Sequence, residues 1–87
     1  MRFRMSNVAL TSSQIRAARA LIRWRAEDLA AKSGVSVATV RRAELTDERT
    51  AMTAVNDAAV RLALESAGVE FIEENGGGPG VRLRKAP

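Results

Sequence analysis

The sequence of 87 residues contains no cysteine, no histidine and no tyrosine, and its aromatic residues are one tryptophan and two phenylalanines. Without cysteine the chain forms no disulfide, and without cysteine and histidine it lacks the commonest ligands of zinc and other transition metals. The same absences remove side chains that enzymes often use as general bases and nucleophiles. We therefore expect a protein of the reducing cytoplasm that is not an enzyme and holds neither a metal nor a cofactor.

Long apolar runs are missing as well. No segment approaches the roughly 20 apolar residues that span a membrane, and the N-terminus lacks the apolar stretch of a signal peptide. No segment combines a large apolar face with a lysine- and arginine-rich face, so membrane-surface binding is not expected either. The glycine run in NGGGPG (residues 75–80) is not a phosphate loop, because no Gly-Lys-Ser/Thr follows it and no helix is expected after it.

The scarcity of aromatic residues also limits the core. Hydrophobic residues make up 46% of the chain but aromatic residues only 3%, so the core must consist mostly of alanine, valine, leucine and isoleucine. Alanine buries little area, and burial contributes only about 25 cal/mol per Å². A single chain of this length therefore has a thin stability margin, which favours a homodimer.

The charge of the chain is unevenly distributed. Residues 1–42 hold nine arginines and lysines against two acids, a balance of +7, whereas residues 43–87 hold five against eight, a balance of −3. A basic first half suits a polyanion, and we expect double-stranded DNA as the partner.

Capping signals predict four helices. Thr11 and Gln14 have the spacing of a capping box, Gly34 supplies the left-handed residue that ends a helix, and Ser36 caps the helix after it. The first three expected helices cover residues 11–22, 26–33 and 36–45. The fourth is expected to begin between residues 50 and 53 and to end near residue 67.

Residues 1–10 are expected to form a flexible basic arm whose Arg2 and Arg4 could reach a minor groove.

The fourth predicted helix has two apolar stripes, of which one is expected to serve the core and the other a second subunit. The first stripe consists of Met52, Val55, Ala59 and Leu62, and the second of Val60 and Leu64. We assign the second stripe to the dimer.

The C-terminal segment changes to a period of two, which predicts a β-hairpin over residues 68–87 with apolar residues on one face and acids opposite arginines on the other. An isolated hairpin is barely stable, so it should pack on the fourth helix or join the hairpin of a second subunit. A frayed glycine-rich tail is the alternative. The predicted dimer interface is Val60, Leu64, Phe71, Ile72, Val81 and Leu83.

Residues 26–45 have the pattern of two helices joined by a tight turn. Small Ala30 lets the helices cross closely, Gly34 makes the turn, and Val40 packs the second helix against the first. This arrangement leaves Val37, Ala38, Arg41 and Arg42 on the outer side, as either a solvated face or a contact surface.

The stretch LAAKSGVSVATVRR resembles the helix-turn-helix of the lambda-repressor-like, or XRE, family of transcriptional regulators, and the resemblance extends over residues 11–67. The ending AGVEFIEENGGGPGVRLR also looks like that of many small bacterial regulators of this family. The resemblance implies a mainly α fold, a bundle of four to five short helices with a C-terminal β-hairpin, whose recognition helix enters the major groove. It also implies a structural pair between Arg19 and Glu44.

The resemblance assigns a DNA contact to each outward residue of the third helix. Ser36 and Thr39 would contact phosphates, while Val37, Ala38 and Arg42 would face base edges with Arg41 beside them. The chain departs from the family pattern at Arg23 and Thr46, where glycine is common. Arg25 and Ala26 replace a capping residue and a phosphate-binding glutamine, so we expect Arg25 to contact the phosphate as a charge. The DNA-binding residues are therefore predicted to be Arg25, Ser36, Val37, Ala38, Thr39, Arg41 and Arg42.

The sequence thus predicts a dimeric, sequence-specific DNA-binding regulator, a repressor or autoregulator. It would bind a palindromic operator with two recognition helices about 34 Å apart and be associated with the nucleoid when bound to DNA. The alternative is a protein-interaction module or antitoxin-type component that holds a partner protein. A DNA-binding protein should lose affinity steeply as salt rises, which separates the two hypotheses.

Overall fold

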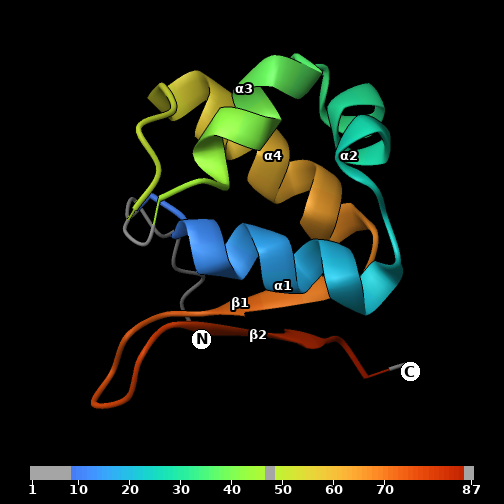
Figure 1. The fold of residues 1–87 in the computed structure, drawn as a ribbon. Coiled ribbons are helices and arrows are strands. Elements are labelled where there is room, and N and C mark those ends of the chain that lie inside the picture. The colour runs from blue at the N-terminus through green and yellow to red at the C-terminus, as the bar shows by residue number, and fades with distance from the viewer. Residues whose placement is uncertain (1–8, 47–48, 86–87) are drawn as a thin grey trace.

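The computed structural model describes residues 9–46 and 49–85, and Figure 1 shows their arrangement. Within these ranges the chain is mainly helical and ends in a two-stranded antiparallel hairpin, as predicted. The elements are α1 (Ser12–Ile22), α2 (Ala26–Ser33), α3 (Val37–Ala43), α4 (Ala54–Ser66), β1 (Val69–Ile72) and β2 (Gly80–Leu83). The hairpin lies on one side of α1, and α3 lies on the opposite side.

Side-chain caps start three of the four helices. At α1 the Thr11 hydroxyl accepts from the Gln14 backbone N–H at 3.0 Å, and the Gln14 side-chain oxygen accepts from the Thr11 N–H at 3.0 Å. This is the predicted capping box. Ser36 accepts from the Thr39 N–H at 3.1 Å at the start of α3. Thr53 caps α4 in the same way, so this helix begins at the late end of its predicted range.

Two helices end at a left-handed residue. Gly34 ends α2 with φ +77°, as its glycine predicts, whereas α1 ends at Arg23 with φ +58°. A residue with a Cβ is disfavoured in this conformation, and glycine tolerates it. The structure therefore explains why the family resemblance leads one to expect glycine at residue 23.

The core lies between α1, the α2–α3 pair, α4 and the inner face of the hairpin. Fully or nearly fully buried residues come from the four helices and β1: Ile15, Ala18, Leu29, Val40, Val60, Leu64 and Val69. Leu10 is also 1% exposed, which corrects the prediction that residue 10 belongs to a loose arm. The rest of the predicted arm, residues 1–8 with Arg2 and Arg4, lies outside the described residues.

The assignment of the second α4 stripe to a dimer is wrong, and the first stripe serves the core only in part, through Met52 and Ala59. Val60 and Leu64 are 1% and 0% exposed, so they belong to the core and are not available to a partner. Val55 and Leu62 are instead 77% and 65% exposed. Asp57 lies on the Val60–Leu64 stripe and is buried together with it. Its Oδ1 accepts from the Leu10 N–H at 3.1 Å, so a charged residue turns inward with this stripe.

The predicted hairpin is confirmed for residues 69–83. Val69 pairs with Leu83 and Phe71 with Val81 on the inner face, and Glu70 pairs with Arg82 on the outer face with a 2.7 Å contact. The hairpin packs on α1 as well as on α4.

Gln14 fixes the loop end of this hairpin to α1. Its side-chain amide donates to the Ile72 carbonyl at 3.3 Å and to the Gly80 carbonyl at 3.1 Å. The same side chain that starts α1 therefore also holds β1 and β2 against it.

Substitutions at the two left-handed positions should have opposite effects on stability. Arg23→Gly should raise the free energy of unfolding by about 1 kcal/mol, because glycine relieves the left-handed strain. Gly34→Ala should lower it by about 1 kcal/mol. No atom lies within 4 Å of a Cβ added at Gly34, so backbone conformation alone would cause that loss. Urea unfolding measures both changes, and a less stable Arg23→Gly protein would contradict the explanation.

Candidate nucleic-acid interface

The third helix has one anchored side and one exposed side. Val40 and Ala43 are buried in the core, and Val35, which precedes the Ser36 cap, is buried with them. Ser36, Ala38, Arg41 and Arg42 are exposed, while Val37 and Thr39 are half-buried. Val37 packs partly on the core, so only part of its side chain faces outward. Of the predicted residues, the structure thus brings those of the third helix together on one outward surface, which we call the α3 surface (Ser36, Val37, Ala38, Thr39, Arg41 and Arg42). Arg25 lies elsewhere, at the start of α2.

The start of α3 carries two linked hydroxyl groups. Ser36 donates from its hydroxyl to the Thr39 hydroxyl oxygen at 2.9 Å and accepts from the Thr39 N–H. Both groups are thereby engaged within the helix cap, so a phosphate at this end would share them with the cap.

The two adjacent arginines have different surroundings. Arg41 donates from Nη2 to the Glu27 carboxylate on the first turn of α2. Within the described residues, Arg42 has no hydrogen bond or ion pair to a side chain. Arg42 also borders a hollow of about 180 Å³, whose other lining residues are Thr39, Ala43, Thr46, Ala51 and Met52. Arg42 is therefore the more available cation of the pair.

Arg25 lies at the start of α2, at its N-cap. Its backbone N–H donates to Asp28 Oδ2 at 2.8 Å, and its guanidinium Nε lies 3.8 Å from the same oxygen. The guanidinium remains mostly exposed. Asp28 thus makes the N3-to-N-cap bond of a capping box, residue 25 makes no cap hydrogen bond with its own side chain, and the arginine side chain extends outward.

The C-terminal end of α3 is held by α1. Arg19 makes a two-point contact with Glu44: Nε lies 2.6 Å from Oε2 and Nη2 lies 2.7 Å from Oε1. A third donor of Arg19, Nη1, bonds the Trp24 carbonyl at 2.9 Å. The exposed fractions of the two charged side chains are 22% and 10%, so the contact is shielded from water. The Glu44 carboxylate raises the pKa of Arg19 above its ordinary value against the effect of burial, so Arg19 remains charged.

Two further side chains of α1 hold the same end of α3. The Ser12 hydroxyl donates to the Ala43 carbonyl and lies 2.7 Å from the Thr46 hydroxyl. Arg16 donates to the Glu44 carbonyl. These contacts satisfy carbonyls at the C-terminal end of α3, which a helix leaves without partners. Together with the Arg19–Glu44 pair they fix the direction of α3 relative to α1.

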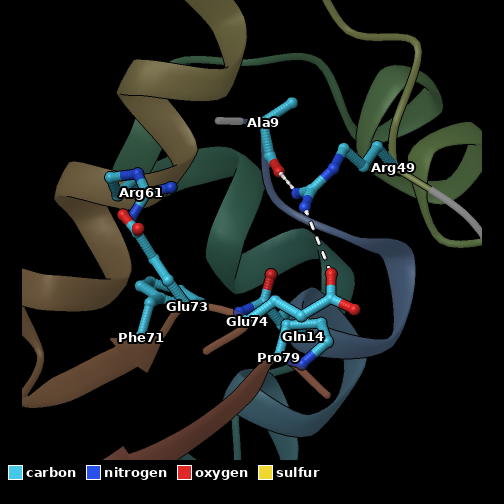
Figure 2. Close-up of a pocket in the computed structure, with 8 residues that line it drawn as sticks. All are labelled: Ala9, Gln14, Arg49, Arg61, Phe71, Glu73, Glu74 and Pro79. Carbon is cyan, nitrogen blue, oxygen red and sulfur yellow. Dashed lines mark hydrogen bonds and ion pairs between the residues drawn. The ribbon is translucent and has the colours of Figure 1, made fainter. Parts of the chain in front are cut away.

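A small charged cavity is lined by residues of the N-terminal segment, α1, α4 and the hairpin, together with Arg49 (Figure 2). Its volume is about 70 Å³, well below the size typical of ligand pockets. Arg49 lies between the Ala9 carbonyl and Glu74, and Arg61 lies over the Phe71 ring at 5.3 Å with the Glu73 carboxylate turned towards it. These charges join the N-terminal segment, α4 and the hairpin to one another.

A larger groove of about 470 Å³ runs between α2 and α4. The groove is lined by the end of α2, the outer side of α4 and Trp24. The lining residues are Trp24, Lys32, Ser33, Ala59, Leu62, Ala63, Ser66 and Ala67. Most of this lining is apolar or small, and Leu62 projects at its edge as an exposed side chain.

The sequence predicted the residues of the α3 surface but not the side chains of other helices that pair with Arg41 and hold the end of α3. Acids in the first turn of a helix are typical partners of the helix dipole, so the sequence pattern does not indicate that Glu27 contacts Arg41. The contacts of Ser12 and Arg16 with the end of α3 have no sequence signal either. A contact between residues 12 and 43 leaves no periodic signal in a sequence, so only the fold reveals it.

Comparison with protein-family models finds no match for this chain, and the search of curated proteins finds no similar sequence. Among the described residues, no three acidic, histidine or cysteine side chains are grouped so that they could hold a metal ion. None of the helices in residues 9–46 and 49–85 has the length and apolar character needed to cross a membrane.

Breaking the Arg19–Glu44 pair should destabilise the protein far more than breaking an exposed pair. Glu44→Ala should lower the free energy of unfolding by about 2–3 kcal/mol, because it leaves a shielded guanidinium without its carboxylate. Glu70→Ala is the matched control, since it breaks the exposed pair with Arg82 and should cost less than about 1 kcal/mol. Urea unfolding of both variants tests this, and equal losses would show that the shielding of the pair has no effect.

Proposed function

We propose that the chain is a sequence-specific DNA-binding transcriptional regulator of the lambda-repressor-like (XRE) type, acting as a repressor or autoregulator. In this proposal α2 and α3 form the helix-turn-helix, and residues 36–45 read the major groove. The observation that carries it is the division of α3. Val40 and Ala43 anchor the helix in the core, and Ser36, Ala38, Arg41 and Arg42 remain on its exposed side.

The proposed contacts follow from the chemistry of these side chains. Arg42 has free donors that could bind guanine O6 and N7, while Ala38 and the exposed part of Val37 could contact a thymine methyl group. Ser36 and Thr39 lie where the first N–H groups of α3 can approach a phosphate. Arg25 would add a charge contact from the start of α2. The rigid attachment of α3 to α1 supports this function, because base reading requires a fixed helix direction.

We further propose that the regulator is a homodimer that uses the outer side of α4 in place of the predicted Val60–Leu64 stripe. The α4 stripe (Val55, Ala58, Ala59, Leu62 and Ser66) carries no charge and has two large apolar residues separated by two small ones. A two-fold axis between Ala58 and Ala59 would cross two α4 helices closely and set Val55 beside the partner's Leu62. Such self-matching favours a second copy of this chain as the occupant of the stripe.

The hairpin remains a proposed second part of this dimer surface. Phe71, Ile72 and Val81 are half-buried and Leu83 is half-exposed, so they offer less area than the α4 stripe. The exposed α4 stripe also supports the alternative function, an antitoxin-type component that holds a partner protein on an apolar surface. In that case the chain would be a monomer when its partner protein is absent.

The DNA-binding proposal is tested by binding at two salt concentrations to a duplex selected from a random pool by the wild-type protein. Affinity should fall steeply as salt rises. Arg42→Ala should weaken binding to the selected duplex at least about tenfold and relax its sequence preference. Arg25→Ala should weaken binding to all duplexes and reduce the salt slope by about one. Arg82→Ala, on the hairpin, is the control for net charge and should have a smaller effect than either.

Salt-independent binding, or no retained DNA, would contradict the proposal. If Arg25→Ala changes neither the affinity nor the salt slope, Arg25 is not the phosphate contact.

The dimer proposal is tested by light scattering at micromolar concentration. The wild-type protein should have the mass of a dimer, and Leu62→Gln should shift it towards the monomer by removing apolar area from the α4 stripe. Leu45→Gln is the matched control, because Leu45 is also a strongly exposed leucine but lies after α3. A monomeric wild-type protein would refute the dimer, and a Leu62→Gln dimer as stable as the wild type would exclude the α4 stripe as its interface.

A further inference from the structure

The contact between Glu27 and Arg41 lies at the surface, beside the residues proposed to read DNA. The exposed fractions of the Arg41 and Glu27 side chains are 56% and 51%. Ion pairs with this exposure add little to stability. The docking of α3 on α2 is already secured by apolar burial at Leu29, Val35 and Val40. The pair therefore has its main effect on the charge of the α3 surface rather than on the fold.

Glu27 makes the two neighbouring arginines electrostatically unequal. Its carboxylate largely cancels the charge of Arg41, whereas Arg42 has no carboxylate partner among the described residues. The hydrogen bond from the Glu27 backbone N–H lowers the pKa of Glu27; desolvation opposes this shift, and the charges of Arg41 and Arg25 lower the pKa further. Glu27 is thus ionised at neutral pH, and Arg41 is held beside a full negative charge.

Cancelling the charge of an arginine affects phosphate and base contacts differently. Attraction to a phosphate depends on net charge, and a carboxylate beside the guanidinium both weakens that attraction and repels the phosphate directly. A guanine edge is neutral and binds through donated hydrogen bonds. The guanidinium has five N–H donors, and the contact with Glu27 occupies a donor of Nη2. Arg41 therefore retains donors for a neutral acceptor while losing much of its attraction to phosphates.

We propose that Glu27 is a specificity-determining residue that withholds Arg41 from the DNA backbone and positions it for a base edge. This inference rests on the proposed DNA-binding function. Glu27 acts through Arg41 and is a positioning residue rather than a direct reader. In this role it lowers affinity for arbitrary DNA, which raises the ratio of specific to non-specific binding.

The experiment compares Glu27→Gln with Glu70→Gln by binding to two duplexes over a range of salt. One duplex is the sequence enriched by the wild-type protein from a random pool, and the other is a shuffled version of it. Both variants remove one negative charge from an exposed ion pair, but Glu70 lies in β1 on the side of α1 opposite to α3. Glu70→Gln therefore measures the effect of net charge alone.

Glu27→Gln should bind the shuffled duplex about five- to tenfold more tightly than the wild type near 0.1 M salt, with a salt slope steeper by about 0.9, as expected for one added phosphate contact. Its affinity for the enriched duplex should rise less, so the specificity ratio falls. In an Arg41→Gln background the same substitution should have no effect beyond that of Glu70→Gln.

The outcomes separate this inference from the proposed function. If the wild-type protein binds no DNA in a salt-dependent way, the proposed function fails and the inference fails with it. If the wild type binds DNA and Glu27→Gln behaves like Glu70→Gln on both duplexes, DNA binding stands and the role of Glu27 is overturned. An unchanged effect of Glu27→Gln in the Arg41→Gln background would likewise overturn it, since Glu27 would then act on the DNA without Arg41.

Discussion

The position of α3 depends on the two-point contact between Arg19 and Glu44. A helix of seven residues is too short to be stable by itself, so its direction must come from its neighbours. Val40 and Ala43 fix one side of α3 by burial, but apolar contacts are not directional. The shielded guanidinium–carboxylate contact and the bond from Ser12 to the Ala43 carbonyl supply the missing direction. The shape of the α3 surface therefore follows from side chains of α1.

The charge on this surface is set by local pairing more than by the composition of the chain. The first 42 residues carry a balance of +7, yet Arg19 and Arg41 are each held by a carboxylate. Arg25 is weakly associated with Asp28. Arg42 has no such partner among the described residues. The balance already subtracts Glu27 and Asp28, so a count along the sequence gives the net charge but not which arginines lie beside a carboxylate. That pairing is decided by contacts that α1, α2 and the end of α3 make in the fold.

The local elements could be predicted from the sequence because their signals are local. The capping box at Thr11, the glycine at residue 34, the cap at Ser36 and the alternation in the hairpin each act within a few residues. The orientation of α4 could not be predicted in the same way. Asp57 is a polar residue on a stripe that turns inward, and the hydrogen bond that allows this comes from Leu10, 47 residues away. The partner of Arg41 was missed for a similar reason, since Glu27 lies in another helix.

The placement of Gln14 and Arg19 on one short helix has a mechanical consequence. Helix α1 spans 11 residues, which corresponds to a rod of about 16 Å. Gln14, on one side of α1, is hydrogen-bonded to the loop end of the hairpin. Arg19 and Ser12, on another side, are hydrogen-bonded to the C-terminal end of α3. Helix α1 is therefore the common attachment of the hairpin and the C-terminal end of α3, two parts of the molecule that share no residue.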